Sequence, residues 1–145
     1  MSISERKSDG PVSDGPVTGR KGHELPAATA VRGWRYHHIG IPTDAKRPGE
    51  IYLERFKMYV SVFETNPCGI QWMRFEPDSL VHELVKSVPH IAFEVDDLQA
   101  AIAGKQILTE PNSPSEGVTV AMILDSGAPV ELMEFKHDVG QGSKP

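Results

Sequence analysis

The chain repeats a two-residue alternation of apolar and polar positions in two separate halves, and the second half is the more regular. Residues Val88–Val95 alternate and are rich in β-branched and aromatic side chains, which predicts a strand. A short helix is expected over Leu98–Ala103, with Asp96 or Asp97 at its N-cap and Gly104 after its last turn. The second half therefore opens with a strand and a helix.

Three more strands are predicted in the second half. Lys105–Thr109 is a short strand candidate, and residues 111–117 are dense in turn-forming residues, which predicts a loop. Val118–Leu124 and Pro129–Phe135 predict a hairpin across the turn at 125–128. The expected order is strand, helix, strand, strand, strand.

The first half preserves the ends of this order, but it has fewer residues where the helix is expected. A strand led by His38 opens it, as a strand led by His90 opens the second half. Lys57–Glu64 and Gly69–Phe75 are further strand candidates. Residues 43–49 include a proline and a glycine, which oppose helix formation, so the first helix is expected to be shortened.

The order of the segments predicts one domain with an arm and a tail. The N-terminal segment repeats Ser-Asp-Gly-Pro-Val at 8–12 and 13–17, and a stretch so rich in turn formers is expected to be a flexible arm. An N-cap at Asp78 and helical spacing up to Val85 predict a helix that links the halves. The expected organisation is an arm (1–33), a single domain (34–137) made of module one (34–77), a linking helix (78–88) and module two (89–137), and a tail (138–145).

Composition narrows the classes of function. A formal net charge of −5 argues against a nucleic-acid partner, and no apolar run approaches the roughly 20 residues that span a membrane. The first residues lack the apolar stretch of a secretory signal, so a cytoplasmic location is expected. The single cysteine, Cys68, cannot form an internal disulfide, which fits a reducing compartment.

The two halves also share short motifs that carry polar side chains. The segment His38–Ile41 resembles His90–Phe93, and Gln71–Phe75 resembles Glu131–Phe135. Because side chains alternate along a strand, a curled sheet would bring the first residues of these motifs to one concave site. These residues are His38, Gln71, His90 and Glu131. Their imidazole, amide and carboxylate groups suit one divalent ion, such as Zn, Ni, Co, Mn or Fe.

A structural interpretation stands beside this one. A histidine on a strand is often a core residue that has hydrogen-bond partners, and a glutamine on a strand often forms only hydrogen bonds. This structural interpretation is preferred for the remaining histidines, which are His23, His37, His82 and His137. Strand alternation also places the His37 side chain on the face opposite to that of His38.

The paired motifs resemble those of the vicinal oxygen chelate superfamily, which includes glyoxalase I, methylmalonyl-CoA epimerase, extradiol dioxygenases and bleomycin-resistance proteins. The resemblance covers about residues 35–136 and is strongest in Pro89–Leu98 and Pro129–Phe135. It implies an α+β fold in which two βαβββ modules form a curled eight-stranded mixed sheet around a groove. In that family these segments supply a metal-binding histidine and a metal-binding glutamate. By position, the ligands would be His38, Gln71, His90 and Glu131.

The glutamine in this quartet resembles methylmalonyl-CoA epimerase more than bacterial glyoxalase I, which has glutamate at the position of Gln71. The resemblance therefore implies a metal-dependent epimerase, isomerase or lyase that stabilises an enolate or related oxyanion of a small oxygen-chelating metabolite. Glu131 is the candidate catalytic residue as well as a ligand. The alternative is a metal-free protein of the same fold that binds a small molecule or confers resistance. The partner in either case is a small molecule, and exposed strand edges favour a homodimer.

Overall fold

The computed structural model describes residues 19–61, 64 and 66–136. The chain divides after Arg35 into two compact units. The first unit contains α1 (Ala27–Ala30), a single turn that follows Pro26. Residues 1–18 of the predicted arm, His137 and the predicted tail lie outside the described residues.

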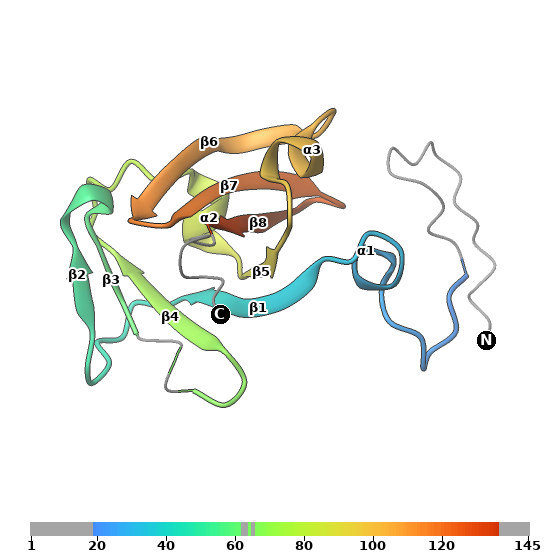
Figure 1. Ribbon diagram of the computed structural model, residues 1–145. Coiled ribbons are helices and arrows are strands. Elements are labelled where there is room, and N and C mark those ends of the chain that lie inside the picture. The colour runs from blue at the N-terminus through green and yellow to red at the C-terminus, as the bar shows by residue number, and fades with distance from the viewer. Residues whose placement is uncertain (1–18, 62–63, 65, 137–145) are drawn as a thin grey trace, which may run out of the picture. The chain divides into compact units, whose positions relative to one another are not determined.

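The second unit is built on an eight-stranded mixed sheet with the order β2-β3-β4-β1-β5-β8-β7-β6. The sheet is curled, and Figure 1 shows the strands β2 to β4 and the strands β6 to β8 as two groups that flank the central strands β1 and β5. The predicted α+β architecture is therefore confirmed. The strands are β1 (Arg35–Pro42), β2 (Ile51–Leu53), β3 (Met58–Val60), β4 (Ile70–Phe75), β5 (His90–Glu94), β6 (Gln106–Ser115), β7 (Val118–Asp125) and β8 (Ala128–Phe135).

The inner face of the sheet carries two apolar clusters, one in each module. In module two the cluster consists of Ala92, Val118, Val120 and Met133, with Phe135 packed against it. In module one it is formed by Met58, Val60 and Met73, with Leu53, Phe56, Phe75 and Val81 packed against it. Because side chains alternate, the residues between these positions face the opposite side, which we call the outer face.

Helix α3 (Leu98–Ile102) covers the outer face of module two, where it contacts β7 and β8. It begins as predicted, since the side chain of Asp97 accepts a hydrogen bond from the backbone N–H of Ala100. Leu98 is only 2% exposed, and on the strands beneath the helix Ile123 and Leu132 are fully buried. Burial of these apolar side chains holds the helix on the sheet.

In module one the described residues between β1 and β2, 43–50, form no α-helix. The segment 43–50 is irregular, as its proline and glycine lead one to expect. The shortened helical element is a 3-10 turn, η2 (Glu54–Phe56), and it follows β2 instead of preceding it. Lys57 ends this turn in the left-handed conformation, with φ of 51°.

The prediction of a loop over residues 111–117 is wrong for residues 111–115, which belong to strand β6. Strand β6 continues through this segment and pairs with β7, although its register shifts three times. Because β6 is the last strand of the sheet, one of its edges has no partner strand in the order, and a proline is tolerated there. The turn-forming residues that suggested a loop therefore mark an irregular edge strand.

The linking helix is shorter than predicted. Helix α2 (Glu83–Ser87) begins after His82, whose ring Nδ1 accepts a hydrogen bond from the N–H of Leu84 at 3.0 Å. Asp78, the predicted N-cap, instead forms an exposed ion pair with Lys57, with 2.8 Å between Nζ and Oδ2. None of the helices in the described part of the chain has the length and hydropathy needed to cross a bilayer.

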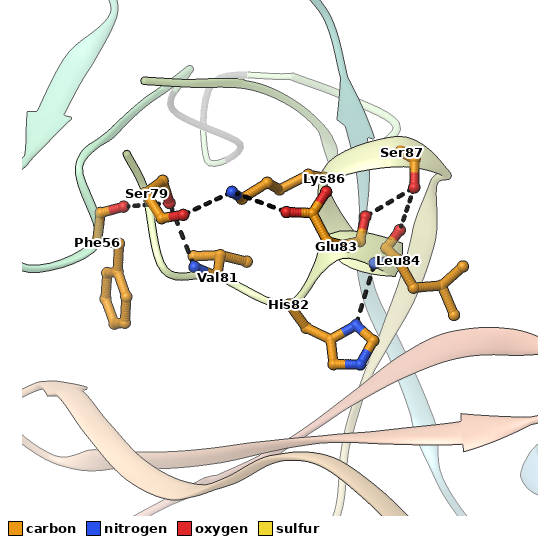
Figure 2. A network of polar contacts seen from close by, with 8 residues as sticks. All are labelled: Phe56, Ser79, Val81, His82, Glu83, Leu84, Lys86 and Ser87. Carbon is orange, nitrogen blue, oxygen red and sulfur yellow. Dashed lines mark hydrogen bonds and ion pairs between the residues drawn. The ribbon is translucent and has the colours of Figure 1, made fainter. Parts of the chain in front are cut away.

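Polar contacts attach this linker to module one (Figure 2). The hydroxyl of Ser79 donates to the backbone carbonyl of Phe56 at 2.7 Å. The Nζ of Lys86 lies 2.5 Å from the carbonyl oxygen of Ser79 and 3.3 Å from the Oε2 of Glu83. The start of α2 is thus fixed to the turn that precedes β3.

Candidate metal centre

Three of the four predicted ligands meet on the inner face, at the centre of the sheet. His38 lies on β1, His90 on the neighbouring strand β5, and Glu131 on β8, where it pairs in register with Ala92. The side chains of both histidines are only 3% exposed, and that of Glu131 is 16% exposed. Strands from both modules therefore contribute to one buried cluster.

The three side chains converge on a single carboxylate oxygen. The Nε2 of His90 lies 3.0 Å from the Oε1 of Glu131, and the Nε2 of His38 lies 3.4 Å from the same oxygen. The two imidazole rings are nearly perpendicular, with centroids 5.9 Å apart. One ligand atom from each of these residues lies within 4.8 Å of the others, a spacing that one metal ion can bridge.

Burial opposes ionisation of Glu131, but hydrogen bonds to His38 and His90 outweigh it and lower the pKa of the carboxyl to about 2. Glu131 is therefore a carboxylate at neutral pH. A carboxylate with two imidazole nitrogens is a donor set that borderline divalent ions accept. The buried Nδ1 of His90 has no hydrogen-bond partner among the described residues. The donor set thus fits a divalent metal.

Gly40 provides the space for His90. A Cβ atom at residue 40 would lie 2.3 Å from the Cε1 of His90, a distance at which two carbon atoms overlap. The ring of His90 therefore packs against bare backbone of β1. A glycine inside a strand is a sequence signal for such a close approach.

His37 also contacts the candidate metal centre, which strand alternation did not predict. Alternation predicts that its side chain and that of His38 lie on opposite faces, but their Nδ1 atoms are 2.8 Å apart. The ring of His37 also stacks on Phe135, with centroids 5.4 Å apart. Burial, together with the neighbouring His38, lowers the pKa of His37. A neutral His37 that accepts the Nδ1–H of His38 would keep the Nε2 of His38 as a metal ligand.

The fourth predicted ligand, Gln71, lies on the same face of the neighbouring strand. It lies on β4 and pairs in register with Gly40 of the parallel strand β1. Its side chain is therefore on the same face of the sheet as that of His38. Its amide Nε2 donates to the carbonyl oxygen of Ser61 at 3.5 Å. A glutamine binds a metal through Oε1, which this hydrogen bond does not use. Ligation by Gln71 stays a prediction.

Comparison with known proteins informs the fold alone. No protein-family model matches the chain, and no curated protein matches its sequence. The structure is similar to that of a hypothetical protein, BH1468, from Bacillus halodurans C-125, with a TM-score of 0.54, 18% sequence identity, and coverage of 72% of this chain and 96% of that chain. A second match is methylmalonyl-CoA epimerase from Mycobacterium tuberculosis, with a TM-score of 0.45, 16% identity, and coverage of 81% and 97%.

Proposed function

We propose that this protein is a metal-dependent enzyme of the vicinal oxygen chelate type that acts on a small oxygen-chelating metabolite. The observation that carries the proposal is the convergence of His38, His90 and Glu131, from three strands and both modules, on one buried point. The repeated motifs and the curled sheet support the same assignment, since the family builds its site between two such modules.

In this proposal His38, His90 and Glu131 hold one divalent ion (Zn, Ni, Co, Mn or Fe), and Gln71 is the fourth ligand. The ion, when bound, would act as a Lewis acid that stabilises negative charge on substrate oxygens, as an epimerase, isomerase or lyase requires. Glu131 is the candidate to accept a proton, although the pKa of about 2 makes its carboxylate a weak base. The homodimer and the cytoplasmic location also stay predictions.

Metal analysis of untagged protein tests this proposal. We expect the purified wild type to carry about one equivalent of metal, because two imidazoles and a carboxylate form a preorganised donor set. His90→Ala should lose most of this metal while the far-ultraviolet circular dichroism stays close to that of the wild type. His23→Ala, which removes an exposed histidine of the first unit, is the matched control and should keep the metal.

A different result would favour the alternative function. If the wild type holds no metal under metal-replete conditions and His90→Ala only lowers its stability, the three residues are a structural cluster. The protein would then belong to the metal-free, small-molecule-binding members of this fold class.

A further inference from the structure

A cavity of about 290 Å³ lies on the outer face of module one, next to β3 and β4. Its walls include Ile70 and Trp72 of β4, which alternate with the inner-face residues Gln71 and Met73. The cavity is therefore on the side of the sheet opposite to His38 and His90. In module two the corresponding side is covered by α3.

Arg47 brings a positive charge to this cavity. Its guanidinium carbon lies 4.2 Å from the ring centroid of Trp72, so the side chain is stacked on the indole. The nearby carboxylate of Glu50 is taken by Arg74, with contacts of 2.6 and 2.9 Å. Glu50 also accepts the backbone N–H of Arg47, but within the described part of the chain no carboxylate pairs with the Arg47 guanidinium.

The other polar walls present hydrogen-bond donors as well. The Oδ1 of Asn66 accepts the backbone N–H groups of Cys68 and Ile70, at 2.8 and 3.2 Å. This assigns the oxygen to the backbone and leaves the amide NH2 to meet a ligand. The Oγ of Ser61 accepts the N–H of Trp72 at 2.8 Å, which leaves the hydroxyl hydrogen to donate. Three donor groups therefore line one cavity, and the side-chain oxygens of Asn66 and Ser61 already accept backbone N–H groups.

We propose that this cavity binds a small organic anion, whose carboxylate or phosphate accepts hydrogen bonds from Arg47, Ser61 and Asn66 and whose apolar part lies against Ile70 and Trp72. An anion would pair with the guanidinium through charge-assisted hydrogen bonds, which are stronger than neutral ones. The apolar surface of Ile70 and Trp72 would favour an anion that carries an apolar group. The inference is independent of the proposed enzyme activity, because it concerns the opposite face of the sheet.

Titration of the full chain with benzoate, phenyl phosphate and inorganic phosphate tests this inference by two-dimensional NMR. We expect saturable shifts of the Trp72 indole N–H and the Ile70 amide with benzoate or phenyl phosphate. Arg47→Gln should weaken this binding by about tenfold or more, as expected for loss of a charge-assisted hydrogen bond. Lys46→Gln removes the same charge from an exposed neighbour outside the cavity walls. This control should weaken binding by less than about twofold, because exposed charges are screened.

Three outcomes would overturn the inference. The first is that no probe produces saturable shifts at Trp72 and Ile70. The second is that both variants weaken binding equally, which would indicate a diffuse charge effect. Inorganic phosphate that binds as tightly as phenyl phosphate would contradict a role for the apolar wall. Titrations repeated with and without added zinc separate this result from the metal proposal, since an anion bound at the metal centre would shift His38 and His90 instead.

Discussion

Module two covers its outer face with helix α3, whereas module one covers the corresponding face with the irregular segment 43–50. Under α3 the contact is apolar, with Leu98 against strands that carry the buried side chains of Ile123 and Leu132. In module one, guanidinium groups stack on aromatic rings, with Arg47 over Trp72 and Arg74 over Tyr59. The outer face of the sheet is therefore covered through apolar burial in module two and through cation–aromatic stacking in module one.

Matching positions of the repeats show how this difference arises. Gln71–Phe75 corresponds to Glu131–Phe135, so Arg74 stands where Glu134 stands in module two. Glu134 accepts the N–H of Leu98 and anchors the start of α3, whereas Arg74 pairs with Glu50 and anchors the loop. Each module thus uses the same strand position to hold a different covering element. The cavity beside Trp72 lies next to this loop, because Arg47 and Gly49 are among its walls.

The largest effect that tests this comparison is expected at Leu98. Leu98→Ala should lower the free energy of unfolding by about 2–5 kcal/mol, because it removes buried methyl groups and leaves a cavity under α3. Chemical denaturation would measure it. The matched control is Leu80→Ala, since Leu80 is 97% exposed and its change should stay within about 0.5 kcal/mol. Similar losses for both variants would show that α3 is not held by apolar burial.

A second, smaller effect is expected at Gly40, which corresponds to Ala92 in the repeats. Gly40→Ala makes module one match module two, but the new Cβ would clash with the ring of His90. We expect a loss of about 1–3 kcal/mol in stability, as for overpacking, together with weaker metal binding. Ala92→Gly is the control, because Ala92 is buried without this clash and its variant should retain metal. Unchanged metal content in Gly40→Ala would mean that His90 does not need its present position.

Regular alternation along single strands accounts for what the sequence predicts well. It gives β5, β7 and β8 to within two residues, and it brings His38, His90 and Glu131 to one face. It cannot give contacts that depend on irregular backbone. Segment 43–50 has no periodicity, so the stacking of Arg47 on Trp72 could not be predicted. His37 was missed because alternation describes ideal strands, and two long adjacent side chains can still meet.

The smallest expected effect concerns the ion pair that anchors the loop of module one. A hydrogen bond from Arg74 lowers the pKa of Glu50 below the ordinary value of 4.5. A carboxyl whose pKa is lowered by folding stabilises the protein above its unfolded pKa, and this contribution is lost as the pH falls through the folded pKa.

Glu50→Gln should therefore be less stable than the wild type at pH 7, by less than Leu98→Ala, and this difference should shrink as the pH is lowered below about 4.5. Glu54→Gln, which alters an exposed carboxyl of η2, is the control and should follow the wild type at every pH. Denaturant titrations between pH 7 and pH 3 would measure the effect. A stability deficit of Glu50→Gln that stays constant over this range would show that Glu50 acts through packing and not through its charge. The loop of module one would then be held by packing, as α3 is held in module two.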